Sequence, residues 1–297
     1  MLAALLAGCG GARVAITPFA EETLSPEPIV KATAIASAAI PRERAMEIAV
    51  ENAGTLLDGP FSAHLKGVTV RDAFLVASLF RVEEGLPYPD TLFFDDGYPD
   101  YYVVVLIQRE EISALATVTT EGEFWSLAPV GGEFSEEAER YPHVSEQEAR
   151  EMAQAYAQEQ GPRVRGPFLA FAGGPFGDEF LPVWWFALEG EETLMTVFVD
   201  QQGHLLTGMS REQLGWFMFK PHMTPEEAVE AAGYWLALTN RFYPSPILEA
   251  VLTSEVGEAE WVESQGENVD RYRIPFGEYV VEIDDAPSDG LFAVRRK

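Results

Sequence analysis

Three stretches of the chain carry the same spacing of small or apolar residues, at positions i, i+3, i+4 and i+7. Residues at these offsets fall on one face of an α-helix, because the helix turns once every 3.6 residues. The three sets are Ala45, Ile48, Ala49 and Asn52; Ala149, Met152, Ala153 and Tyr156; and Ala228, Ala231, Ala232 and Trp235. The spacing predicts three helices, each with one buried face.

Two of these helices have clear start signals. Ser145 is followed three residues later by Glu148, and Thr224 by Glu227, with Pro225 at the first helical position. In such a capping box, the Ser or Thr oxygen and the Glu carboxylate each accept a backbone N–H that the helix leaves unpaired. The first helix starts at Pro41 without a capping residue before it, so its boundary is less sharply defined.

Short apolar segments separated by turn residues follow each predicted helix, and this alternation is typical of antiparallel strands. They span 101–107, 112–119 and 124–125 after the first helix; 168–171, 181–188, 194–199 and 204–207 after the second; and 272–276, 279–284 and 291–294 after the third. The pattern predicts an α+β protein of three repeated units, each one helix packed on an antiparallel meander of three to four strands.

Unequal spacing between the three helices indicates diverged units with insertions rather than a regular solenoid. We expect the units at residues 41–143, 144–222 and 223–297, with an insertion in the first from Phe74 to Pro99. Residues 9–40 are rich in Ala, Thr, Ser and Pro and show no amphipathic period, which predicts a flexible tether. Residues 1–8 are interpreted as the remnant of a signal peptide.

The charge balance is strongly acidic, with 48 Asp and Glu against 20 Lys and Arg and a formal net charge of −28. Such a field repels phosphate backbones, so we expect no nucleic-acid partner. The acidic surface either keeps the protein soluble or attracts a cationic partner or a divalent ion. Composition alone does not separate these alternatives.

Cys9 is the single cysteine of the chain, so no internal disulfide can form. The segment Leu6-Ala7-Gly8-Cys9 resembles the lipobox of bacterial lipoproteins. This resemblance implies diacylglycerol on the Cys9 thiol and an extracytoplasmic protein anchored to the bacterial cell membrane. The eight residues before Cys9 are short for a signal peptide, which suggests either a start codon upstream of Met1 or a truncated sequence. The alternative is that Cys9 is only a small apolar residue.

A second resemblance lies in the hairpin Val197-Phe198-Val199-Asp200-Gln201-Gln202-Gly203-His204-Leu205-Leu206. Together with the capped helix before it, this segment resembles the PepSY domain, whose last hairpin reads as an apolar strand, Asp, two residues, Gly and a second apolar strand. PepSY domains are associated with peptidase propeptides and with extracytoplasmic regulatory or inhibitory proteins. The resemblance therefore implies a module that binds or inhibits another protein in trans, a peptidase being one candidate.

Aromatic residues supply the candidate partner-binding side chains: Trp184, Trp185, Trp216 and Phe217. Neighbouring residues of a strand point to opposite faces, so one of Trp184 and Trp185 should pack under the helix. The other is either covered by a neighbouring unit or exposed as a binding patch. The segment with Trp216 and Phe217 joins the second and third units. Its aromatic side chains either pack between these two units or anchor an interface with a partner.

Asp95, Asp96 and Asp100 surround a turn at Gly97 and are weak candidates for a Ca²⁺ site, since hard oxygen ligands suit this ion. The same residues are also ordinary turn formers. No sequence motif of a catalytic site or of a cofactor-binding loop occurs, and no cofactor is expected.

The leading hypothesis is a lipid-anchored protein without catalytic activity that binds an unidentified protein or peptide by adding a strand to a sheet edge, with aromatic anchors. Two alternatives stay open. One is a secreted hydrolase that uses paired carboxylates, because such pairs are assembled in space and leave no sequence motif. The other is a purely structural envelope protein.

Overall fold

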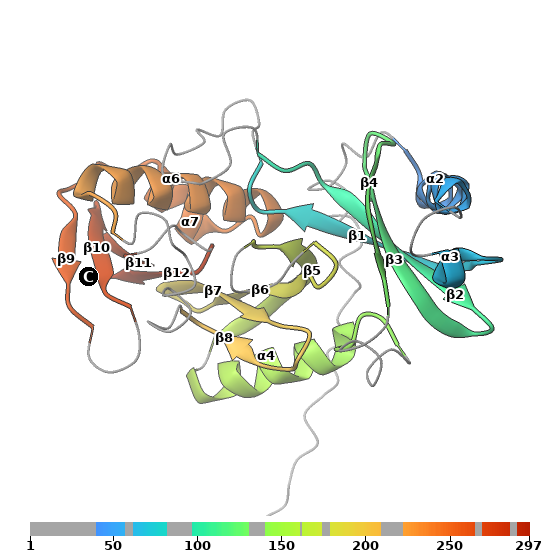
Figure 1. Ribbon diagram of the computed structural model, residues 1–297. Coiled ribbons are helices and arrows are strands. Elements are labelled where there is room, and N and C mark those ends of the chain that lie inside the picture. The colour runs from blue at the N-terminus through green and yellow to red at the C-terminus, as the bar shows by residue number, and fades with distance from the viewer. Residues whose placement is uncertain are drawn as a thin grey trace, which may run out of the picture.

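The computed structural model describes residues 40–56, 62–81, 97–130, 140–160, 162–173, 179–208, 222–264, 269–285 and 290–297. Its first part forms a four-stranded antiparallel meander with a helix on one face (Figure 1). The elements are α2 (Arg42–Thr55), α3 (Ser62–Leu65), β1 (Thr69–Ser78), β2 (Tyr101–Gln108), β3 (Glu111–Thr119) and β4 (Phe124–Pro129). Helix α2 buries Ala45, Ile48, Ala49 and Ala53 against the sheet, so the predicted stripe is confirmed except that Asn52 is only half-buried.

The second part has one helix before its strands, whereas the first part has α2 and the short α3. Its elements are α4 (Glu146–Gln160), β5 (Arg163–Phe171), β6 (Val183–Glu189), β7 (Thr193–Val199) and β8 (Leu205–Leu206). The capping box before α4 is present, because the backbone N–H of Glu148 donates to Ser145 Oγ at 3.2 Å and the Ser145 N–H donates to the Glu148 carboxylate at 2.8 Å. The Ser145 hydroxyl also donates to the Glu148 carboxylate at 2.7 Å. This bond, the Ser145 N–H and the contact with Arg140 lower the pKa of Glu148 to about 2.

The third part contains two helices before its strands, where the sequence predicted one. Its elements are α6 (Pro225–Phe242), α7 (Pro246–Leu252), β9 (Glu260–Val262), β10 (Arg271–Phe276), β11 (Tyr279–Asp284) and β12 (Phe292–Arg296). The predicted capping box at Thr224 and Glu227 is confirmed. Helix α7 has its own start signal, because Ser245 accepts the Ile247 N–H and Pro246 follows it.

The strands within the described ranges join one 12-stranded sheet in the order β4-β3-β2-β1-β5-β6-β7-β12-β11-β10-β9, with β8 paired to β7. Almost every pairing is antiparallel, so the α+β class is confirmed. The exception is β1 with β5, which run parallel and pair only through Ala77 with Ala170 and Ser78 with Phe171. The first part is therefore joined to the rest of the sheet by a very short ladder.

Strand β1 also corrects the position of the predicted insertion. Residues Phe74 to Ser78 were assigned to an insertion, but they continue β1. Of these, Phe74 to Val76 pair with Val103, Tyr102 and Tyr101 of β2. The prediction was wrong because Thr69–Ser78 includes Arg71 and Asp72 at a bulge, which breaks the apolar alternation of the strand.

Helices cover the sheet from opposite faces. Figure 1 shows α6 and α4 on opposite sides of the central strands β5 to β7, while α2 lies at the far end over β1 to β4. Two hydrophobic clusters result: a small one beneath α2, and a large one that contains α4, α6 and the strands between them. Strands β2 and β3 contribute to both clusters, because alternate residues face opposite sides.

A buried ion pair lies where the first part meets the others. Arg81 Nη2 is 2.6 Å from Asp100 Oδ2, and the two side chains are 7% and 4% exposed. The second oxygen of Asp100 accepts the Ser78 N–H at 2.7 Å. Tyr234 of α6 completes the junction: its hydroxyl donates to the Leu79 carbonyl at 2.7 Å and accepts the Arg81 N–H at 3.1 Å.

Burial dominates the electrostatics of this junction. It raises the pKa of Asp100 even though Arg81 and the Ser78 N–H act to lower it, and it raises the pKa of Tyr234 to about 12. The desolvation of the carboxylate thus exceeds the attraction of the guanidinium. We expect the pair to determine which groups meet at the junction rather than to add net stability.

We therefore predict that Asp100→Ala lowers the free energy of unfolding by about 3 to 5 kcal/mol, because Arg81 keeps a buried charge without its partner. Urea unfolding followed by circular dichroism measures the change. The double variant Arg81→Met/Asp100→Leu should regain most of the loss, because it removes both charges. A double variant as unstable as Asp100→Ala would show that the ion pair itself stabilises the junction.

Candidate functional site

The two tryptophans of β6 are both buried. Trp184 is 6% exposed, and its indole N–H donates to the Val144 carbonyl at 2.7 Å, just before α4. Trp185 is 0% exposed and packs edge-on against Phe242 and Tyr243, at the end of α6, at 5.3 and 5.1 Å. Opposite faces of β6 are thus covered by different helices. Neither indole is therefore exposed to a partner. Of the two alternatives, coverage by a neighbouring part of the fold applies, and an exposed binding patch does not.

The remaining candidate residues are not brought together. Asp100 is bound to Arg81 and Ser78 and is not free for a metal ion. Asp95, Asp96, Trp216, Phe217 and Cys9 lie outside the described residues. Within the described ranges, no group of three or more His, Cys, Asp or Glu is arranged to hold a metal ion. None of the helices described is long and apolar enough to cross a membrane.

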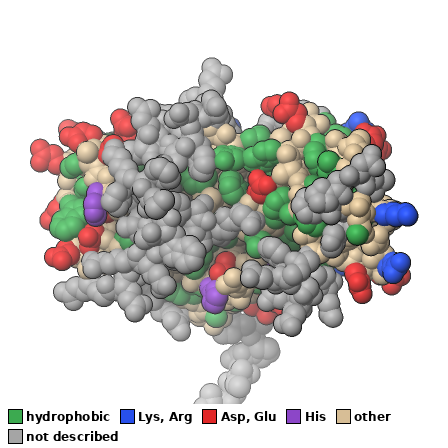
Figure 2. All heavy atoms as spheres, in the orientation of Figure 1, with side chains coloured by type: hydrophobic (Ala, Val, Ile, Leu, Met, Phe, Trp, Pro, Cys, Tyr) green, Lys and Arg blue, Asp and Glu red, His purple; other side chains and the backbone are tan. Residues whose placement is uncertain are grey.

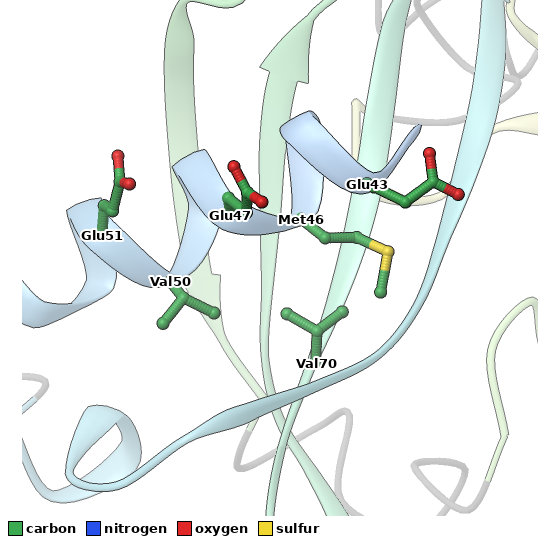
Figure 3. A pocket seen from close by; sticks show the side chains of 6 residues that line it. All are labelled: Glu43, Met46, Glu47, Val50, Glu51 and Val70. Carbon is green, nitrogen blue, oxygen red and sulfur yellow. The ribbon is translucent and has the colours of Figure 1, made fainter. Parts of the chain in front are cut away.

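A groove between α2 and β1 is the concave surface that we consider the candidate site. Its volume is about 490 Å³, and Figure 3 shows the six side chains that line it. Five come from α2 and one from β1: Glu43, Met46, Glu47, Val50, Glu51 and Val70. We call it the α2–β1 groove.

The floor of the α2–β1 groove is apolar. Met46 and Val50 are one turn apart on α2 and point toward Val70 on β1 (Figure 3). Val50 is 37% exposed, in contrast to Ile48 and Ala49 beside it, which are buried in the small cluster. The helix therefore has a second apolar stripe next to its core-facing one, and this stripe faces the groove instead of the sheet.

Strand β1 contributes Val70 to the groove, and much of its outer flank has no partner among the described strands. Antiparallel pairing with β2 occupies its other flank from Thr69 to Val76, and β5 joins it only at Ala77 and Ser78. Among the described strands, none pairs with the outer flank from Thr69 to Val76. One N–H of β1 is capped locally, since Ala73 N–H donates to the carboxylate of Asp72 at 2.7 Å.

Acidic side chains form the rim. Glu43, Glu47 and Glu51 follow one another at every fourth position of α2, and all three are exposed. Arg44 contacts two of them, with Nη1 2.8 Å from Glu47 and 3.4 Å from Glu51, and these hydrogen bonds raise the pKa of Arg44. A further ion pair, between Arg42 and Asp72, connects the start of α2 to β1.

Charge is distributed unevenly over the molecule. On the face in Figure 2, Lys and Arg side chains gather at the end that carries α2, β2 and β3, whereas acidic side chains occur at both ends. At the opposite end, edge strand β9 exposes Trp261, which is 48% exposed although its indole N–H donates to Asp285 at 2.9 Å. The sequence analysis did not select Trp261, because β9 is only three residues long.

Compared with known proteins, the chain matches no family model, no curated protein sequence and no solved structure.

If Val50 lines an open groove, its replacement should cost little. We predict that Val50→Gln changes the free energy of unfolding by no more than about 0.5 kcal/mol, because Gln is a good helix former at an exposed position. The neighbouring Ile48→Ala should lower it by about 2 to 4 kcal/mol, because it opens a cavity in the core. Thermal and urea unfolding compare the two. A loss above about 1.5 kcal/mol for Val50→Gln would mean that another segment covers the groove.

Proposed function

We propose that this chain is a lipid-anchored extracytoplasmic protein that binds another protein or a peptide and has no catalytic activity of its own. Support for the anchor comes from the lipobox-like segment at Cys9 and from the tether-like composition of residues 10–40. In this proposal the membrane contact is made through the lipid, and the folded part is held near the membrane surface.

We further propose that the folded part consists of three PepSY-like units. This is supported by the recurrence of a helix followed by strands that pair in chain order: β1 to β4, β5 to β7 and β9 to β12. The turn that suggested the resemblance is also consistent with it. Asp200 accepts the N–H groups of Gln202 and His204 on its carboxylate, and Gly203 has a φ of 83°, which favours glycine.

The α2–β1 groove is the observation that carries the binding function. An extended segment of a partner can pair its backbone with the open flank of β1, as in other complexes formed by strand addition. Its side chains on the α2 side would then pack on Met46, Val50 and Val70. This mode needs no large flat interface, because backbone hydrogen bonds supply affinity and the groove supplies selectivity. A peptidase that the protein inhibits or regulates is one candidate partner.

Partner binding can be tested by site-specific photo-crosslinking in the cell. A photo-reactive benzoylphenylalanine in place of Val50 should give a discrete crosslinked species, because the side chain lines the groove. The matched control is the same amino acid in place of Leu252, which is also 37% exposed but lies at the end of α7. No crosslink from position 50, or the same products from both positions, would contradict binding at the groove.

The lipid anchor and the membrane localisation are tested separately, by intact mass and membrane fractionation. Expressed in a bacterial host with its coding sequence extended upstream of Met1, the protein should begin at Cys9, carry added diacylglyceryl mass and sediment with the membrane. Cys9→Ala should move it to the soluble fraction, because the thiol is the attachment point. An unmodified protein that still carries Met1 would exclude the lipid anchor.

A further inference from the structure

Edge strand β9 carries the most exposed large apolar side chain among the described residues. This is Trp261, which is 48% exposed. Val256, which is 43% exposed, lies on the same edge, because it bridges to Phe276 of β10, the strand that β9 pairs with. None of the described strands pairs with the outer flank of β9. An exposed indole thus lies at one end of the sheet, opposite to the end that α2 covers (Figure 1).

A buried carboxylate holds this indole in place. The Asp285 side chain is 2% exposed, and its Oδ2 accepts the Trp261 indole N–H at 2.9 Å. The same oxygen lies 3.0 Å from Nδ1 of His222, whose side chain is 67% exposed. The other oxygen, Oδ1, accepts the Met223 N–H at 2.9 Å. Two exposed rings are therefore fixed by one buried oxygen, and rings that are already ordered lose little conformational freedom when a partner binds.

The first turn of α6 lies beside these rings. Tyr272 is directly opposite Trp261 in the β9–β10 ladder, and its hydroxyl donates at 2.7 Å to the backbone carbonyl just before the cap of α6. Burial raises the pKa of Tyr272, and the charges of Asp285, Glu227 and Glu226 raise it further. Asp285 is buried and Glu227 belongs to the capping box, so Glu226 is the exposed carboxylate of this turn.

Exposed glutamates without an ion-pair partner lie near the rings. Glu260 and Glu263 lie on and just after β9, and Glu226 lies in the first turn of α6. None of the three makes an ion pair within the described ranges, and the sequence has no Lys or Arg from Phe242 to Asp270. Figure 2 shows acidic and hydrophobic side chains at this end of the molecule, whereas Lys and Arg gather at the other end. We call this region the Trp261 surface, and its residues are His222, Glu226, Glu260, Trp261 and Glu263.

The charges decide between the occupants that this surface could take. Two copies of the chain joined along β9 would bring Glu260 and Glu263 of one copy close to those of the other, and like charges opposite one another destabilise strand pairing. A basic segment brings the opposite charge. Arg suits both features of the surface, because its planar guanidinium stacks on an indole and its N–H donors bind carboxylates.

We infer that the Trp261 surface docks a basic protein segment that places an arginine side chain on the indole. Asp285 is a positioning residue for this contact, because it holds the indole while its own side chain stays buried. The inference goes beyond the binding proposed for the α2–β1 groove and does not depend on it, because it assigns a second contact surface at the other end of the sheet.

The probe is a capped pentapeptide in which threonine and arginine alternate, titrated into the isotope-labelled protein. A second peptide has citrulline in place of each arginine, which keeps the shape and removes the charge. Indole N–H signals in the NMR spectrum report where the peptide binds, and the signal of Trp261 is identified by its loss in Trp261→Leu. The indole signals of Trp184 and Trp185 serve as internal references, because both rings are buried. Amide signals of β9 give the Kd for every variant.

Two variants test the ring and the charges separately. Trp261→Leu removes the indole, and Glu226→Gln/Glu260→Gln/Glu263→Gln removes the three charges. Urea unfolding verifies that each variant is folded. The matched control removes the same charge from three exposed glutamates of the first part that also make no ion pair within the described ranges: Glu110→Gln/Glu111→Gln/Glu121→Gln.

We expect the arginine peptide to shift the indole signal of Trp261 and to leave those of Trp184 and Trp185 in place. Its Kd should rise by about fivefold or more in Trp261→Leu and in the triple charge variant, because the cation–π contact or the carboxylate contacts are lost. In the control the Kd should change by less than about twofold, because charges more than about 8 Å away are largely screened at physiological ionic strength. The citrulline peptide should bind at least about fivefold more weakly.

Four outcomes would overturn the inference. Equal losses in the charge variant and its control would show that only the overall charge attracts the peptide. Equal binding of the two peptides would exclude a role for the cation, and an unshifted Trp261 signal would place the binding elsewhere. Absence of binding would remove the Trp261 surface as a docking site. Each of these outcomes leaves the α2–β1 groove to be decided by the crosslink from position 50.

Discussion

The ion pair between Arg81 and Asp100 is the interaction on which the arrangement of the parts depends. Arg81 lies three residues after the end of β1, and Asp100 lies immediately before β2. Arg81 also lies 5.2 Å from the ring centre of Phe242 on α6. The backbone ladder at this point is short, with two residue pairs between β1 and β5 and one further hydrogen bond from Leu79 N–H to the Phe171 carbonyl. Side chains must therefore supply the specificity that the ladder lacks.

Aromatic packing surrounds the ion pair and excludes water from it. Phe80 lies edge-on to Phe171 of β5 and to Trp235 of α6, at 6.4 and 5.7 Å. Because the charges are desolvated, a change in how the parts meet would leave a buried charge or hydroxyl without a partner, which is costly. The junction thus allows few alternative arrangements of the first part.

The open flank of β1 is a consequence of this junction. A parallel ladder between β1 and β5 along their whole length would have occupied this flank, and β1 would have been an interior strand throughout. The junction instead joins only the last two residues of β1 to β5. The rest of the strand is the border of a four-stranded sheet, beneath the side of α2 that carries Met46 and Val50.

Local signals in the sequence predicted local structure well. The capping boxes at Ser145 and Thr224 and the turn at Asp200 to Gly203 are present, because each depends on residues within one turn of one another. The junction could not be predicted, because Arg81, Asp100 and Tyr234 are far apart in the chain and meet only in the folded protein. Trp184 and Trp185 were ambiguous for a related reason: strand alternation places them on opposite faces but does not say what covers each face.

Part of the groove was visible in the sequence. Glutamates at every fourth position of the first helix, with Met46 and Val50 one turn apart beside its buried stripe, indicate a helix with one more apolar face than its core needs. The sequence did not indicate which element lies next to that face. Because β1 was assigned in part to an insertion, no strand was expected beside Met46 and Val50, and the groove could not be predicted.

An open strand flank is a hazard for a protein, because it invites pairing with a second copy. Here the charges beside β1 discourage that outcome. Asp72 occupies one backbone N–H and pairs with Arg42, and the exposed Glu43, Glu47 and Glu51 on α2 add like charges that repel when two copies approach. The charges beside β1 thus oppose self-association along its flank.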